Sequence, residues 1–171
     1  MQSCCKRVYP ASMTDDFNRY QTTELPPGYS QLAWHRGFGR QIGPLFEKRE
    51  NGRLTRAFRV EEYHTNGMLN AHGGMLMTFA DMAWGGAVEN DEDTWWVTVR
   101  LLCDFLAGAP LGSFVEGDGV VVGQQDDIIT VEGRIWTGDK TIMRLDGAAV
   151  DNHVAPYDMV RKMRAERAMH W

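Results

Sequence analysis

The chain has 171 residues, of which 43% are hydrophobic and 24% are charged. This balance is typical of one globular domain with a single core. Eighteen basic and 23 acidic residues give a net charge of -5, which argues against a nucleic-acid-binding protein. The sequence has no run of 18 apolar residues, so we expect no membrane-spanning helix.

The beginning of the chain carries no apolar stretch of the kind that marks a secretory signal. The three cysteines, Cys4, Cys5 and Cys103, cannot form a fully paired set of disulfides. Both features favour a reduced protein of the cytoplasm.

Residues 1–41 contain prolines and scattered aromatic side chains, and we expect them to form an arm on the domain. A short helix fits residues 13–20 of this arm. Residues 42–150 carry the stronger structural signals and define the expected domain. The remaining residues, 151–171, form a tail in which a helix is expected over residues 156–170.

The first strong signal is a β-hairpin. Residues 42–50 and 53–64 flank Asn51-Gly52, and Asn-Gly tolerates the positive φ angles of a type I′ turn.

A single apolar helix follows the hairpin. Residues 75–88 contain no proline and come directly after His72-Gly73-Gly74. Fourteen helical residues span about 21 Å. The segment is apolar nearly all round, so the helix must be covered on every side.

The rest of the domain is predicted to be strands over residues 95–106, 113–122, 128–137 and 140–150. Their short connections indicate antiparallel pairing, and one helix against a long antiparallel sheet is an α+β arrangement. In the first of these strands, alternation places Val97 and Val99 on one face and Thr98 and Arg100 on the other. A second subunit or the terminal segments would cover the helix side that the sheet leaves open.

Asp81 is the only charged residue between His72 and Val88. Burying a carboxylate without partners is costly, so an acid in this helix is a candidate general base or nucleophile. Two plainer interpretations stay open, namely a carboxylate at a solvent-exposed edge of the helix or one that is paired with an arginine.

The glycines that precede the helix are a second candidate feature. The first turn of a helix leaves amide N–H groups unpaired and carries partial positive charge. Such a group can stabilise a carbonyl oxygen that gains negative charge. The alternative is that Gly73-Gly74 is only a tight entry turn.

The joint spacing of these residues carries more information than each alone. Asn66, Gly73 and Asp81 follow the pattern Asn-x6-Gly-x7-Asp, which resembles the active-site pattern of hotdog-fold acyl-CoA thioesterases. The stretch His72-Gly73-Gly74-x6-Asp81 is most similar to the phenylacetate-degradation branch of that family. The resemblance covers about residues 42–150.

The resemblance implies an antiparallel sheet of five to six strands wrapped around one central helix. It also implies a homodimer, or a dimer of dimers, that hydrolyses an acyl-CoA to the free acid and coenzyme A. The Gly73 amide would polarise the thioester carbonyl, and Asp81 of the facing subunit would act as base or nucleophile. Asn66 and Thr98 would position water. Coenzyme A enters only as part of the substrate, and no cofactor or metal is expected.

Further residues are candidates for substrate binding. His72 and Gly74 are candidates because they flank the amide of Gly73. Arg134 and Lys140 lie around the last predicted hairpin, where cations suit the phosphates of coenzyme A, although a solvated charged face is the more common explanation for each such residue.

Arg100 raises a doubt about catalysis, because alternation puts it on the same face as Thr98. It is available to a substrate carboxylate or to Asp81, and a cation beside Asp81 would weaken that base. A non-catalytic acyl-CoA-binding or regulatory protein is therefore the alternative function.

A hotdog dehydratase is a third possibility, with His72 as its only candidate histidine. Trp84, Trp95 and Trp96 either line an aryl-acyl pocket or belong to the core. The acyl group, the choice between coenzyme A and a carrier protein, and the choice between dimer and tetramer all stay open.

Overall fold

The computed structural model describes residues 25–32, 37–88 and 96–151. The helices predicted over residues 13–20 and 156–170 lie outside the described residues. The described elements, in chain order, are β1 (Ser30–Gln31), α1 (Phe38–Gln41), β2 (Leu45–Glu50), β3 (Arg53–Arg59), the 3-10 turn η2 (Glu62–His64), α2 (Gly73–Gly85), β4 (Trp96–Phe105), β5 (Phe114–Gln125), β6 (Ile128–Thr137) and β7 (Lys140–Asp151).

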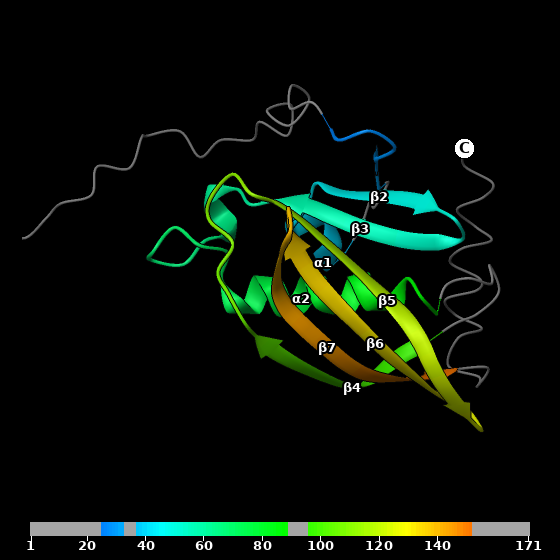
Figure 1. Ribbon diagram of the computed structural model, residues 1–171. Helices are drawn as coiled ribbons and strands as arrows, with labels where there is room; N and C mark the ends of the chain where they lie inside the picture. Colours follow the sequence, from blue (N-terminus) through cyan, green and yellow to red (C-terminus); the bar gives the residue numbers. More distant parts are fainter. Residues whose placement is uncertain (1–24, 33–36, 89–95, 152–171) are drawn as a thin grey trace, which may run out of the picture.

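The strands form one sheet in the order β1-β2-β3-β5-β6-β7-β4, and every neighbouring pair is antiparallel. The sheet has seven strands instead of the expected five to six, because Ser30 and Gln31 of the arm add a short strand beside β2. Strand β4 lies at the opposite edge. The predicted α+β architecture is confirmed, and Figure 1 shows the sheet curving around α2.

The predicted hairpin is formed by β2 and β3. Asn51 and Gly52 adopt φ angles of 52° and 76°, as a type I′ turn requires. The second strand ends at Arg59, earlier than the predicted His64, because the chain there turns into η2.

Helix α2 supplies the centre of the core. The largest fully buried side chains come from this helix, from the strands that surround it and from Val60, which directly follows β3: Trp84, Phe58, Phe79, Ile135, Ile142, Met143, Val60, Val115 and Val131. The prediction of a helix covered by a sheet is therefore confirmed, and the helix begins two residues earlier than predicted, at Gly73.

Two glycines of β5 let the helix approach the sheet closely. A Cβ atom at Gly117 would lie 2.9 Å from Cβ of Ala83, and one at Gly119 would lie 2.8 Å from Cα of Trp84. At the end of the helix, the buried Arg56 guanidinium donates a hydrogen bond to the carbonyl oxygen of Met82. A cation at this end is favourable because the helix dipole is negative there.

Strand β4 contains a β-bulge that overturns one prediction from the sequence. Thr98 is paired with Ala149 of β7, and Arg100 is paired with the next residue, Ala148. Val99 is therefore the extra residue. Paired residues share a face and successive residues alternate, so Thr98 lies on the inner face with the buried Ala149, and Arg100 lies on the outer face.

None of the helices in the described ranges has both the length and the hydropathy needed to cross a membrane.

Candidate active site

Asp81 and Thr98 are brought together by α2 and the inner face of β4. The Thr98 hydroxyl donates a hydrogen bond of 2.6 Å to Oδ1 of Asp81. Asp81 is only partly buried, and Thr98 is exposed. The carboxylate therefore has a fixed orientation and remains accessible, which are the two properties that a general base or a nucleophile needs.

The structure also shows which amide at the start of α2 is available to a ligand. The His72 amide donates to the carbonyl oxygen of His64 at 2.8 Å, and the Gly74 amide donates to Nδ1 of His72 at 2.9 Å. The other residues of the first turn are Gly73 and Met75, and Met75 is buried. Within the described part of the chain, the amides of these two residues donate neither to the His64 carbonyl nor to the His72 ring. Gly73 is therefore the residue best placed to present an N–H to a carbonyl oxygen.

His72 has a structural role in this arrangement, because its side chain is the N-cap acceptor of α2. A ring nitrogen that accepts from an amide carries no proton. The contact fixes the histidine beside the Gly73 amide and agrees with the structural role that the sequence favoured over catalysis by His72.

Asn66 is held by the loop in front of the helix. Its Oδ1 atom accepts hydrogen bonds from the amides of Met68 at 2.9 Å and Asn70 at 3.3 Å. Because the carbonyl end of the Asn66 side chain is occupied, the NH₂ end is the part that can reach a ligand. That end is a donor only, so it suits a water oxygen or a substrate carbonyl.

His64 links these elements, and its role was not predicted from the sequence. It is buried, its Nε2 contacts the carbonyl oxygen of Ile42 at 2.9 Å, and its Nδ1 accepts from the Glu61 amide at 3.0 Å. Burial lowers the pKa of His64, with the carbonyls of Ile42 and Arg59 acting in the opposite direction. Glu61 and His64, three residues apart, make reciprocal capping contacts. The sequence did not reveal them, because Glu-x-x-His differs from the Ser/Thr-x-x-Glu/Gln pattern that predicts a capping box.

Arg100 does not pair with Asp81. On the outer face its guanidinium forms an ion pair of 2.7 Å with Asp146 of β7, and both side chains are about half exposed. The expectation that Arg100 shares a face with Thr98 is wrong, because it assumed strict alternation and the bulge at Val99 breaks that alternation.

The two predicted phosphate-binding cations lie apart from the Asp81–Thr98 pair. Arg134 is on the outer face of β6, where its guanidinium lies 4.6 Å from the ring centre of Trp136. Lys140 is the first residue of β7, next to the exposed turn that joins it to β6. The chain by itself does not bring either cation to the carboxylate.

Gly73 and Asp81 of one chain are also far from each other. Both lie on α2, and a separation of eight residues corresponds to about 12 Å along a helix axis. A thioester carbonyl polarised by the amide of Gly73 cannot meet Asp81 of the same chain.

The aromatic and thiol side chains near α2 have separate roles. Trp84 is fully buried and belongs to the core. Trp96 is partly buried and packs against Trp84 with 5.3 Å between ring centroids, whereas Trp95 lies outside the described residues. Burial, assisted by the carboxylates of Asp104 and Asp81, raises the pKa of the Cys103 thiol, which disfavours the nucleophilic thiolate.

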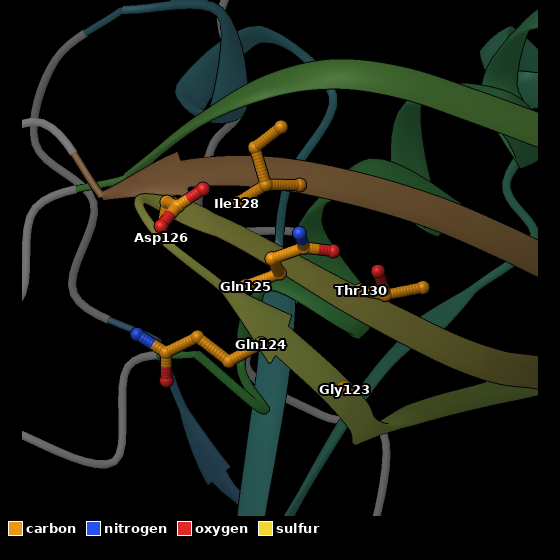
Figure 2. Close-up of a pocket in the computed structure, with 6 residues that line it drawn as sticks. All are labelled: Gly123, Gln124, Gln125, Asp126, Ile128 and Thr130. Atoms are coloured by element: carbon orange, nitrogen blue, oxygen red, sulfur yellow. The ribbon is translucent and has the colours of Figure 1, made fainter.

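A cavity of about 490 Å³ lies at the end of the β5–β6 hairpin, away from these residues. Figure 2 shows its six labelled lining residues: Gly123, Gln124, Gln125, Asp126, Ile128 and Thr130. None of them was predicted as a site residue. Within the described residues, no group of three or more His, Cys, Asp or Glu side chains is arranged to hold a metal ion.

Comparison with known proteins shows which class of protein the chain is similar to. The family model of the thioesterase superfamily matches residues 69–143, the segment that contains α2 and most of the sheet. The strand order and the enclosed helix define a hotdog fold, and the match to the thioesterase superfamily model agrees with that fold.

Individual relatives agree with this class. A Pseudomonas aeruginosa protein whose name gives it as a candidate esterase is 29% identical over 126 residues, which cover 72% of this chain and 94% of the relative. The PaaI protein from the phenylacetic acid degradation operon of E. coli has a TM-score of 0.60 at 21% identity, covering 66% of this chain and 82% of its own. The predicted resemblance in fold to a protein of the phenylacetate-degradation branch is confirmed.

Two further solved structures have the same fold. Zebrafish thioesterase superfamily member 2 has a TM-score of 0.61 at 22% identity, covering 68% of this chain and 87% of its own. A hypothetical thioesterase from Streptococcus pneumoniae, solved with coenzyme A, has a TM-score of 0.58 at 19% identity, covering 63% and 88%. The match to the thioesterase superfamily model and the relative whose name contains the word esterase together support the hydrolysis of thioesters in general.

Proposed function

We propose that the protein hydrolyses an acyl-CoA to the free acid and coenzyme A. The observation that carries this proposal is the hydrogen bond between Thr98 and Asp81, which orients an accessible carboxylate on an otherwise apolar helix. Water adds to the thioester carbonyl carbon and loses a proton to Asp81, the C–S bond breaks, and the departing thiolate is protonated. Direct attack by Asp81, followed by hydrolysis of the resulting anhydride, is the alternative order of events.

The carbonyl would be polarised by Gly73 of a second subunit. The separation of about 12 Å between Gly73 and Asp81 along one helix makes a site within one chain incomplete. A two-fold dimer would bring the helix start of each subunit to the carboxylate of the other and form two equal sites.

Strand β4 is the edge through which such a dimer would form. An edge strand presents unpaired backbone groups that favour pairing with another strand. Its outer-face side chains Val97 and Leu102 are 38% and 53% exposed, so a partner strand would also remove apolar surface from water. A dimer, or a dimer of dimers, is the assembly that we propose.

Three structures of one relative support coenzyme A as the thiol and these residue types as the machinery. The Streptococcus pneumoniae relative was solved with coenzyme A, and structures of its Asp-to-Ala and Thr-to-Ala mutants are known. Asp81 and Thr98 are the corresponding residue types in the site proposed here. Arg134 and Lys140 stay predictions for phosphate binding, and a cytoplasmic location remains expected.

The non-catalytic alternative loses its main argument. That alternative assumed that Arg100 neutralises Asp81, whereas the structure pairs Arg100 with Asp146. Binding without turnover is therefore an outcome of the test below and not a second proposal.

The test is thiol release from a panel of acyl-CoA esters, followed with a thiol reagent. A general base contributes about 10²- to 10⁴-fold, so Asp81→Ala and Asp81→Asn should lower kcat by that range while the circular dichroism spectrum is retained. Thr98→Ala should cause a smaller loss of kcat, and Thr98→Ser should restore most of that loss.

Asp139→Asn, in the exposed β6–β7 turn, is the matched control. Near-normal turnover by Asp81→Ala contradicts the assignment, and saturable binding without thiol release by the wild type supports the binding protein.

A further inference from the structure

The Asp81–Thr98 pair has a neighbouring contact between the same two elements. Gly85 in the last turn of α2 lies against the indole of Trp96 at the beginning of β4. A Cβ atom placed on Gly85 would be only 2.1 Å from Cζ2 and 2.2 Å from Cη2 of that ring. The six-membered ring therefore occupies the space that any larger residue at position 85 would need.

This contact is about one helical turn from the carboxylate. Gly85 follows Asp81 by four residues, which is about 6 Å along a helix. Trp96 precedes Thr98 by two residues on the same strand face, which is about 6.6 Å along a strand. The two separations match, so the indole borders the hydrogen-bonded pair on the side of the helix C-terminus.

The indole is also held in place. It packs against Trp84, which is fully buried, and belongs to the partly buried residues that contact the core. The other aromatic side chain on the inner face of β4, Phe105, packs beside Gly73, about two helical turns from Asp81. Trp96 is therefore the aromatic surface that an acyl group beside Asp81 would meet.

We infer that Trp96 is a specificity-determining residue that limits the length of the acyl group. An acyl chain that extends from the attacked carbonyl carbon toward the end of α2 reaches the fixed indole after about 6 Å. Short acyl groups fit in front of the ring, and long straight chains do not. This inference rests on the proposed thioesterase activity and adds the substrate class to it.

The test measures kcat/KM for butyryl-, hexanoyl- and decanoyl-CoA with the wild type, Trp96→Phe and Trp96→Ala. Pocket changes of this size alter selectivity by about tenfold or more, so Trp96→Ala should raise the decanoyl-to-butyryl ratio by at least that factor. Trp96→Phe keeps an aromatic ring against Gly85 and should give an intermediate ratio. It also keeps the test decisive if Trp96→Ala does not fold.

Trp136→Phe is the matched control, because Trp136 lies on β6, donates to Glu116 and contacts Arg134 of the outer face. Its ratio should equal that of the wild type. A ratio within about twofold of the wild type in both Trp96 variants, or a wild type that already prefers decanoyl-CoA, overturns the inference and leaves the thioesterase activity standing. A wild type that releases thiol from no ester overturns both.

Discussion

At the scale of single residues, the start of α2 depends on a histidine outside the site. His64 holds the 3-10 turn through its ring, and its carbonyl oxygen accepts the His72 amide. His72 in turn caps the helix through Gly74. The Gly73 amide is thus oriented by two consecutive contacts, one from the His72 amide to the His64 carbonyl oxygen and one from the Gly74 amide to the His72 ring.

His64 should make stability depend on pH. Burial lowers its pKa in the folded protein, whereas the unfolded chain titrates near the ordinary value of about 6.5. Below that value the unfolded chain binds a proton that the folded protein does not, so the free energy of unfolding should fall as the pH decreases, until the lower folded pKa is passed. Urea unfolding at about pH 7 and about pH 5 measures this fall. His64→Gln should be less stable at the higher pH and should lose less on acidification, and an equal loss in both proteins would contradict the assignment.

The sequence alone predicted most of the candidate site residues but not how they are oriented. The isolation of Asp81 in an apolar helix and the glycines before it could be seen from residue types. The partner of Arg100 could not be seen, because a one-residue bulge leaves no mark in an alternating pattern of valines and threonine. His64 escaped notice because its ring contacts the carbonyl oxygen of Ile42, which lies 22 positions earlier in the chain.

At the scale of elements, the position of α2 is set by the glycines beneath it. Gly119 is covered by backbone atoms of Trp84, which cannot move aside as the end of a flexible side chain can. At Gly123, on the same strand, an added Cβ atom would have no neighbour within 4 Å. The two positions therefore separate the effect of close contact from the general effect of replacing glycine.

Gly119→Ala should destabilise the protein by about 1–3 kcal/mol, the usual cost of overpacking. Gly123→Ala should change the free energy of unfolding by less than about 0.5 kcal/mol, as is usual for surface substitutions. Chemical unfolding of the two variants beside the wild type provides the comparison. Equal stability of the two variants would mean that α2 can shift away from β5.

The order of most of the elements was predictable because each of those elements has a local signal. Asn51-Gly52 defined the hairpin, and the proline-free apolar segment after His72 defined the helix. The two-residue strand β1 has no such signal, since Ser30 and Gln31 pair with β2 only through the tertiary fold. The burial of Trp84 likewise depends on Gly119, a residue 35 positions away that alternation cannot connect to it.

At the scale of the whole molecule, the proposed dimer makes a prediction that a single-chain site does not. Gly73→Pro removes the amide N–H, and proline is favoured at the first position of a helix. His72 has φ −63° and ψ 139°, which a residue before proline adopts readily. The substitution therefore removes one donor while the helix keeps its start.

Asp81→Asn and Gly73→Pro should each be inactive alone and should complement each other when co-expressed. Random pairing in a two-fold dimer gives half heterodimers with one intact site of two, so about a quarter of the wild-type activity should return. The double variant co-expressed with Asp81→Asn is the control and should stay inactive. No recovery from the mixture, with dimers present by size-exclusion chromatography, would show that both groups act within one chain.

The placement of Gly73 and Asp81 on one helix has a consequence for how the chain can vary. Inserting or deleting one residue between them would rotate the carboxylate by about 100° about the helix axis and turn it away from Thr98. In the proposed dimer the helix of each subunit contributes residues to both active sites. A single insertion or deletion in α2 would therefore disable both sites at once. The loop before His72 and the turns between the strands are free of this constraint, so length variation among related chains should be confined to them.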